Sequence, residues 1–287
     1  MSSPFSLRIF VADGDPDGLR VVERSNWIGK ALIFPRALLP KVKQRDELGQ
    51  TGVYLLLGPR DDGEGEKLYI GEGDPIRPRL ESHYAQKDFW TRAVCFVAAP
   101  GQLNKAHVQF LEANLVCLAK AAKRMPLDNG NAPAEPTLSE ADRADMLVFL
   151  HNMLGMLPVL GVQAFEQAPP ATAAAATLLT CKGKGVLATG YESSQGFVVK
   201  AGSHAVAESV PSMQQHVRGM YELRQELIGN GVLAAVASGY RFTQDYVFTS
   251  PSTAAAVVLG RSANGRIEWK DAQGRTLKEL QAQEAAA

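Results

Sequence analysis

The sequence predicts an α+β protein with two folded parts. Short segments rich in β-branched and aromatic residues alternate with segments whose apolar residues recur every three or four positions, which is typical of strands interspersed with amphipathic helices. Of the 287 residues, 46% are hydrophobic and 21% are charged, and this composition excludes disordered and fibrous proteins. Residues 166–177, which are rich in alanine and proline, predict a linker between the two parts.

Residues 1–49 predict a small front module that packs on the domain behind it. Residues 6–12 alternate between apolar and polar side chains like a strand, and residues 14–18 form a cluster of turn-forming residues. Residues 20–24 and 31–34 predict further strands or a short helix.

Residues 50–165 predict a central domain with a helical extension. Residues 52–71 predict a hairpin, 76–85 a helix and 94–98 a strand. Residues 103–123 predict a helix whose apolar stripe lies beside Glu112, so this carboxylate is either partnered or functional. A capping-box pattern at residues 137–140 predicts the start of a helix through residue 152, and 154–162 predicts an apolar helix or turn.

Residues 178–287 predict a second small α+β domain. Three strands are expected at 178–181, 185–191 and 196–200, followed by an amphipathic helix at 213–228 and a hairpin at 240–248. Ser250, as an N-cap, and Pro251, in the first turn, predict a helix that ends at Gly260.

Two short runs stand on either side of the polar loop in the predicted hairpin. They are Gly52-Val53-Tyr54 and Tyr69-Ile70-Gly71, and Arg79, His83 and Glu112 follow them in that order. Each run alone is typical of a strand end, but the ordered set over residues 50–131 resembles the GIY-YIG endonucleases. The resemblance implies a small mixed or antiparallel sheet flanked by helices, and hydrolysis of phosphodiester bonds.

The resemblance also implies a metal ion and a set of catalytic residues. Glu112 matches the family glutamate that holds one Mg²⁺, with Mn²⁺ as a substitute. Tyr54 matches the tyrosine that positions or deprotonates the attacking water, and Tyr69 matches a supporting tyrosine. Arg79 matches the arginine that stabilises the phosphate, and His83 matches a histidine that binds phosphate or relays a proton.

Four further residues are expected to contact the substrate: Gly71, Arg77, Lys87 and Asn129. Gly71 gives the backbone room beside the site. The family asparagine after the long helix corresponds to Asn129 or Asn131, and we favour Asn129. Gly73 departs from the family pattern, because a small hydroxyl residue is common at that place.

Simpler interpretations of the same residues stay open. Tyr54 and Tyr69 are each compatible with a half-buried strand tyrosine, and Glu112 with a salt bridge to Lys105 or Lys120.

The second domain resembles an uncharacterised domain often found behind GIY-YIG nuclease domains, through residues 250–261 and 269–277.

The predicted partner is nucleic acid, with DNA favoured. The formal net charge is zero, so a polyanion must meet a local basic patch, and basic residues outnumber acidic ones over residues 67–124. The sequence shows neither a signal peptide nor a membrane span, and its three scattered cysteines indicate a reducing cytoplasm. An RNA-directed nuclease and a noncatalytic nucleic-acid-binding or protein-interaction adaptor are the alternatives.

Overall fold

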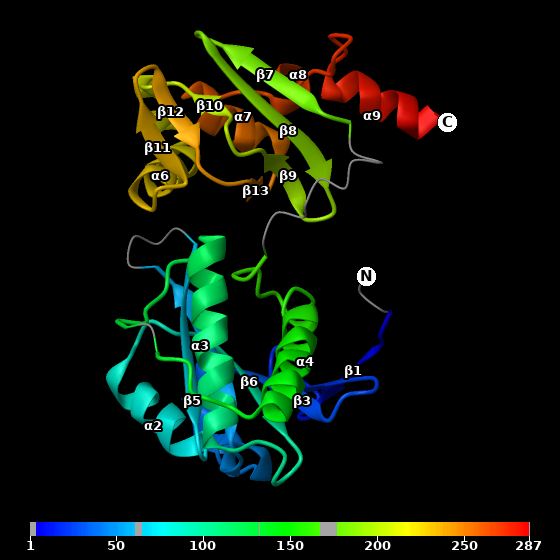
Figure 1. Ribbon diagram of the computed structural model, residues 1–287, viewed down its shortest axis with the longest axis vertical. Coiled ribbons are helices and arrows are strands. Elements are labelled where there is room, and N and C mark those ends of the chain that lie inside the picture. Colours follow the sequence, from blue (N-terminus) through cyan, green and yellow to red (C-terminus); the bar gives the residue numbers. More distant parts are fainter. Residues whose placement is uncertain (1–3, 61–64, 132, 167–176, 287) are drawn as a thin grey trace. The chain divides into compact units, whose positions relative to one another are not determined.

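The computed structural model describes residues 4–60, 65–131, 133–166 and 177–286. It confirms the α+β class, with antiparallel sheets flanked by helices. The chain divides into two compact units, residues 1–166 and 167–287, each shown in Figure 1. The predicted linker at 166–177 lies almost wholly outside the described residues. Among the described residues, no helix combines the length and the apolar composition needed to cross a membrane.

The first unit is built on one antiparallel sheet. Its described strands, in spatial order, are β1 (Leu7–Val11), β2 (Arg20–Arg24), β3 (Gly29–Pro35), β6 (Arg92–Ala98), β4 (Gly52–Pro59) and β5 (Glu66–Gly73). The predicted front module is not a separate body packed on this sheet. Its three strands are part of the sheet, because β3 pairs with β6 along seven residues from Gly29↔Ala98 to Pro35↔Arg92.

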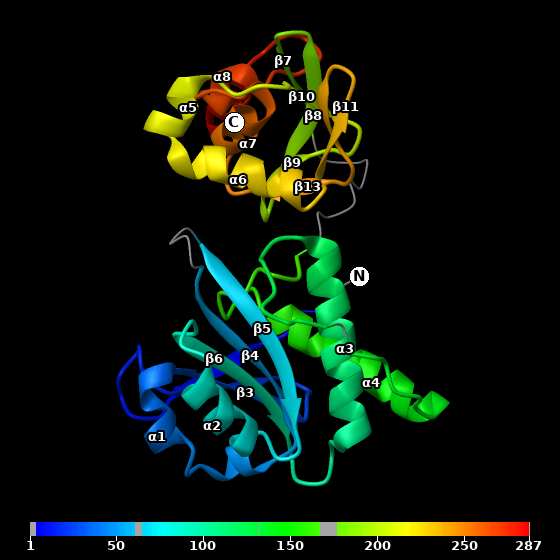
Figure 2. The ribbon, with the colours of Figure 1, turned by 90° about the vertical axis from the view of Figure 1, so that its left-hand side faces the viewer.

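Helices cover both faces of this sheet, as Figure 2 shows. One face carries α3 (Lys105–Ala122) and α4 (Glu140–Met156), whose apolar residues join Val53, Leu55 and Ile70 in a core. The other carries α1 (Leu39–Val42) and α2 (Arg77–Gln86), which pack on Tyr54 and Leu56. Because side chains alternate along a strand, β4 and β5 contribute to both cores, and the buried apolar residues of both faces hold the hairpin rigid.

Two helix starts differ in how well the sequence predicts them. The helix predicted at 103–123 is α3, and the Asn104 side chain caps it by accepting a hydrogen bond from the His107 amide. The capping-box pattern predicted a start near Thr137, but Ser139 is the N-cap of α4 and accepts from the Asp142 amide. The start therefore falls two residues later than predicted.

The described part of the second unit contains two antiparallel sheets around a buried helix. One sheet has the order β13 (Tyr246–Phe248), β9 (Gly196–Val199), β8 (Val186–Ser193) and β7 (Leu179–Gly183). The other has the order β10 (His204–Ala205), β12 (Gly239–Phe242) and β11 (Leu233–Val236). The helices are α5 (Pro211–His216), α6 (Arg218–Gly229), α7 (Pro251–Leu259), α8 (Gly265–Glu268) and α9 (Leu277–Ala286).

The prediction for this unit was right for the three strands β7, β8 and β9 and for one helix, and it was wrong for two elements. Ser250 caps α7 and the helix ends at Gly260, as predicted, and Gly260 adopts the left-handed conformation. The helix predicted at 213–228 is broken at Val217 into α5 and α6. The predicted hairpin at 240–248 is absent from the described residues, because β12 pairs with β10 and β11 whereas β13 pairs with β9.

Candidate functional site

The hairpin of β4 and β5 brings the two tyrosines of the short runs to the same face of the sheet. Tyr54 is opposite Gly71 in the register, and Leu56 is opposite Tyr69. The two tyrosine rings lie 6.3 Å apart, on the face that α2 covers. Tyr54 is fully buried and Tyr69 is partly buried. The hairpin predicted from the sequence is therefore what places these two side chains together.

The Tyr54 hydroxyl is enclosed by three neighbours. Its oxygen lies 2.9 Å from Nε2 of His83, and Arg79 forms a side-chain hydrogen bond with the same hydroxyl. A Cβ atom on Gly71 would lie 2.4 Å from this oxygen, which is closer than real Cβ contacts come. The room that Gly71 leaves is thus occupied by Tyr54. The structure gives Gly71 a packing role, and substrate contact at Gly71 stays a prediction.

Arg79 and His83 lie one turn apart on the same side of α2, so both reach the tyrosine pair. Burial of the His83 ring, with the charges of Arg79 and Lys87, lowers its pKa to about 4, so the imidazole is neutral at pH 7. Arginine can only donate, so the Tyr54 oxygen accepts from Arg79 and its one proton points at His83 Nε2. His83 then carries its own proton on Nδ1.

Burial also sets the protonation state of Tyr54. Removal of the phenol from water raises its pKa above the ordinary value of 10, although the Arg79 charge acts in the opposite direction. The Tyr69 ring closes the group, with its centroid 4.7 Å from that of His83. At neutral pH the cluster is therefore a neutral tyrosine hydrogen-bonded to a neutral histidine, with one arginine beside them.

Glu112 projects from α3 toward the same region. Burial, together with the nearby Glu72 carboxylate, raises its pKa to about 7, although the charges of Arg79 and Lys105 oppose the shift. The sequence left open a salt bridge from Glu112 to Lys105, but the Lys105 ammonium lies 2.5 Å and 2.7 Å from the two oxygens of Glu72. Glu112 is thus a carboxylate without an ion-pair partner among the described residues.

Glu72 was missed by sequence reasoning. It directly follows Gly71 on β5, and alternation along the strand turns it toward α3, the face opposite Tyr69. Its position next to the second short run was the signal that could have revealed it. Lys105 offsets the charge of Glu72, so Glu72 acts on Glu112 as a neighbouring carboxylate that is itself ion-paired.

Lys87 and Arg77, both predicted to bind substrate, lie in different surroundings. The Lys87 ammonium is 4.7 Å from the centroid of the Tyr69 ring and 2.5 Å from a carboxylate oxygen of Asp128, so it borders the cluster. Arg77 precedes Arg79 by two residues and so lies on the opposite side of the helix, where it donates to the Arg45 carbonyl at 3.2 Å. The fold does not bring Arg77 to the tyrosines.

Asn129, and not Asn131, contacts the hairpin. The Asn129 side-chain oxygen accepts from the Ile70 amide at 3.0 Å, and its side-chain nitrogen donates to the Ile70 carbonyl at 2.7 Å. The Asn131 side chain is exposed. At the outer edge of β5, the Asn129 side chain therefore makes the two backbone hydrogen bonds to Ile70 that a neighbouring strand would otherwise make. This is a structural role for Asn129. Its predicted contact with substrate stays a prediction.

Gly73, the departure from the family pattern, has a packing reason. A Cβ atom there would lie 2.7 Å from the Ile76 Cα and 2.8 Å from the Pro75 carbonyl oxygen. Backbone atoms cannot move away as a flexible side chain can, so the approach of α2 to β5 requires glycine. A hydroxyl residue is excluded by this approach in the present backbone.

The basic surplus over residues 67–124 is partly neutralised. Carboxylates pair with five of the basic residues in this segment, namely Lys67, Lys87, Arg92, Lys105 and Arg124. Arg79 differs, because it is exposed and forms no ion pair with a described carboxylate. The guanidinium beside the tyrosines is thus available to an incoming anion, whereas much of the surrounding positive charge is already matched.

The donor set at Glu112 fits a hard divalent cation. Mg²⁺ is usually held by one or two carboxylates together with water and substrate oxygens. The raised pKa of Glu112 reflects a carboxylate whose negative charge is poorly compensated, which a cation would relieve. The described residues contain no group of three or more histidines, cysteines or acidic residues that could form an all-protein metal site. One or two carboxylates remain as the possible ligands.

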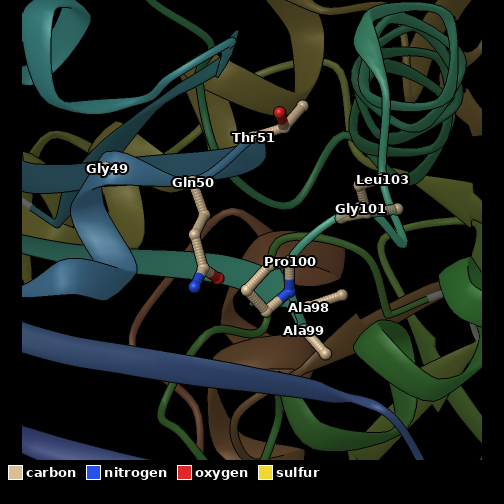
Figure 3. A pocket seen from close by; sticks show the side chains of 8 residues that line it. All are labelled: Gly49, Gln50, Thr51, Ala98, Ala99, Pro100, Gly101 and Leu103. Atoms are coloured by element: carbon tan, nitrogen blue, oxygen red, sulfur yellow. The ribbon is translucent and has the colours of Figure 1, made fainter.

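A separate pocket of about 200 Å³ lies where β4 begins and β6 ends (Figure 3). Its lining contains no charged side chain and none of the predicted site residues: Gly49, Gln50, Thr51, Ala98, Ala99, Pro100, Gly101 and Leu103. Figure 3 shows the Gln50 amide directed toward Pro100. With no cation to meet a phosphate, this pocket does not extend the tyrosine cluster.

Comparison with known proteins identifies part of the second unit. Residues 179–281 match a domain of unknown function (DUF4357), which accounts for most of that unit. No curated protein matches the chain, and no solved structure matches it. The match carries no activity with it.

Proposed function

We propose that the protein is a metal-dependent endonuclease of the GIY-YIG type that hydrolyses phosphodiester bonds in DNA. One observation carries the proposal: five residues spread over 59 positions of sequence converge around the β4–β5 hairpin. They are Tyr54, Tyr69, Arg79, His83 and Glu112, which interact directly or through their charges.

Each residue has a role that its surroundings support. Arg79 is exposed and cannot lose its proton, so it meets the phosphate and stabilises the extra negative charge of the transition state. Glu112 holds the divalent cation, which when bound supplies charge neutralisation at the phosphate and at the leaving oxygen. Tyr69 and Lys87 border the cluster and orient the substrate.

Tyr54 and His83 form a route for the proton of the attacking water. As the water oxygen bonds to phosphorus and the bond to the leaving sugar oxygen breaks, the Tyr54 oxygen takes the water proton. Its own proton passes along the 2.9 Å hydrogen bond to Nε2 of the neutral His83. The raised pKa of Tyr54 makes a free phenolate costly, which favours concerted transfer over a preformed base.

A noncatalytic nucleic-acid-binding adaptor is the second candidate. One observation favours it: the Tyr54 side chain has no exposed surface, so water reaches its hydroxyl only after Arg79 moves aside. Substrate binding would supply that movement, because a phosphate competes for the same guanidinium. The second unit would position the nucleic acid in either case. The three free cysteines support a reducing cytoplasm as the location.

The test is cleavage by the purified full-length protein. Supercoiled plasmid, single-stranded circular DNA and a structured RNA are incubated with Mg²⁺, with Mn²⁺ and with EDTA. We expect cleavage that requires the metal and falls at least about a hundredfold in Glu112→Gln and Arg79→Ala. Exposed residues outside the cluster serve as matched controls, Glu140→Gln and Arg241→Ala, and should leave the rate unchanged.

Three results would change the assignment. Preferential cutting of RNA would make the protein an RNA-directed nuclease. Binding of nucleic acid without cutting, unaltered in Glu112→Gln, would favour the adaptor. Cutting that persists in both Glu112→Gln and Arg79→Ala would move the activity away from this cluster.

A further inference from the structure

The two edge strands of the six-stranded sheet, β5 and β1, differ in whether other segments hydrogen-bond to their outer sides. At the β5 edge, residues 126–129 run alongside the strand: Leu68 donates to the Pro126 carbonyl, Asp128 donates to the Leu68 carbonyl, and Asn129 binds Ile70. At the opposite edge, β1 pairs with β2 alone, and no other described residue pairs with it along its length. One edge is thus covered and the other is open.

The open edge presents a regular row of backbone groups. The Ser25 amide donates to Ser6 and the Ala12 amide donates to Leu19, so even-numbered residues of this strand bond to β2. Alternation then turns the N–H and C=O groups of Leu7, Ile9 and Val11 away from β2. Among described residues, one weak contact is made to this row, from the Gly14 amide to the Val11 carbonyl at 3.4 Å.

The middle of this edge strand carries two exposed apolar side chains. Ile9 is 52% exposed and Phe10 is 58% exposed, although they point to opposite faces of the sheet. On the face of Ile9, Val148 of α4 is 61% exposed and lies one turn before Asn152, whose carbonyl accepts from Arg24 of β2. An exposed apolar edge strand is a template for pairing with another strand.

The geometry points to a second copy of this chain as the partner, through antiparallel pairing of β1 with β1. A two-fold axis at Ile9 sets Ile9 opposite Ile9 of the partner subunit, and Leu7 opposite the partner's Val11. All three outward-facing residues then form hydrogen-bonded pairs, which the alternation in β1 allows. The two sheets become one continuous sheet, and both open edges disappear.

The side chains of β1 are self-complementary in this register. On the α3 and α4 face, the strip formed by Leu7, Ile9 and Val11 meets the same three residues, so the buried contact is wholly apolar. On the other face Arg8 is directly opposite the partner's Phe10, and a guanidinium beside an aromatic ring is a favourable pair. Like charges are not placed directly opposite one another anywhere along the strand.

The first experiment measures mass in solution for the full chain without metal or nucleic acid, so its outcome is independent of the proposed nuclease activity. Wild type at micromolar concentration is expected to have twice the chain mass by light scattering. Ile9→Lys should be monomeric, because a lysine on the edge opposes strand pairing. Leu187→Lys, a similarly exposed position at 46% in the second unit, should remain dimeric.

The second experiment tests the register by disulfide trapping in a Cys117→Ser background, which removes the exposed native cysteine. Arg8 and the partner's Phe10 form a non-hydrogen-bonded pair, with Cα atoms about 4.5 Å apart, within disulfide reach. Arg8→Cys mixed with Phe10→Cys should cross-link under mild oxidation. Neither variant alone should do so efficiently.

Two results would overturn the proposal. One is a monomeric wild type over the whole micromolar range. The other is a dimer that survives Ile9→Lys and gives no cross-link in the mixture, because the chains would then associate through another surface. A circular dichroism melt of Ile9→Lys that matches wild type excludes unfolding as the cause of a monomer.

Discussion

A Cβ atom on Gly71 would lie 2.4 Å from the hydroxyl oxygen of Tyr54, so these two residues of facing strands fit together only while residue 71 is glycine. The contact joins the two short runs that the sequence shows on either side of the hairpin loop. It also fixes the Tyr54 ring against His83, 2.9 Å from the hydroxyl. Packing and the proposed chemistry therefore depend on the same pair of residues.

Gly71→Ala should displace the Tyr54 ring and destabilise the first unit by about 1–3 kcal/mol, the usual cost of an overpacked core. Urea unfolding followed by tyrosine and tryptophan fluorescence measures the loss. Gly130→Ala is the matched control, because no atom lies within 4 Å of the added methyl group. An equal effect of the two substitutions would contradict the packing argument.

Asn129→Ala should expose the edge of β5, because the side chain satisfies both backbone groups of Ile70. We expect the Ile70 amide to lose protection in hydrogen exchange by roughly tenfold or more, with a stability loss of about 1–2 kcal/mol. Asn131→Ala, at an exposed side chain two residues later, should leave the exchange of Ile70 unchanged.

Glu112→Gln should stabilise the protein at alkaline pH. Burial raises the folded pKa of Glu112 to about 7 from its ordinary value of 4.5, so the folded state holds the proton more tightly than the unfolded state. The wild type then loses stability as the pH rises from 4.5 to 7, and the variant lacks this loss.

Glu112→Gln should raise the free energy of unfolding by about 1 kcal/mol above pH 7 and by close to zero below pH 4.5. The value above pH 7 is smaller than the full pKa shift implies, because solvent still screens part of the carboxylate. Thermal melts at pH 4.5 and pH 8 measure it. Addition of Mg²⁺ should raise the melting temperature of wild type but not of the variant. A gain that is the same at both pH values would show that ionisation of Glu112 is not its cause.

His83 should titrate near pH 4 and carry its proton on Nδ1 at pH 7, since Nε2 accepts from Tyr54. Nitrogen-detected NMR of the imidazole distinguishes the two tautomers directly. Because the folded state binds this proton more weakly than the unfolded state, the folded protein keeps the full stability contribution of His83 above pH 6.5. It loses this contribution as the pH falls through 4. His151→Gln, at an exposed histidine, should not alter this pH dependence, whereas His83→Phe should remove its His83 component.

Arg224 in the second unit should be hard to replace. It is 2% exposed, and its guanidinium donates to the carbonyls of Val206, Ala207 and Val257, with no carboxylate among the described residues paired to it. Arg224→Ala would leave these buried acceptors without donors and should cost about 2–4 kcal/mol. Arg241→Ala, at an exposed position, should cost less than about 0.5 kcal/mol in the same melt.

Local sequence patterns predicted the elements that carry the candidate site. The alternation of side chains predicted the hairpin of β4 and β5, and the helical repeat of apolar residues predicted α3 with Glu112 beside its buried stripe. Such patterns are reliable because they record which face of an element is buried, and that depends on residues only a few positions apart.

These local patterns did not predict side-chain partners that are distant in the sequence. Lys105 was considered as a partner of Glu112 but binds Glu72, 33 positions away. Asn129 was expected to contact substrate, and no sequence pattern indicated that its side chain also binds the backbone of Ile70. In both cases the side chain has several chemically acceptable partners, and only the packing of α3 and of residues 126–129 against β5 decides which one lies within reach.

The sequence by itself determined the α+β class, the order of the candidate residues and the periodic faces of the main elements, because these follow from backbone geometry and local burial. Only the tertiary structure decided that the first three strands join the central sheet, and that β12 and β13 belong to different sheets. Strand pairing is chosen by long-range packing, and backbone hydrogen bonds have the same chemistry with every partner, so the sequence pattern of one strand does not specify its neighbour.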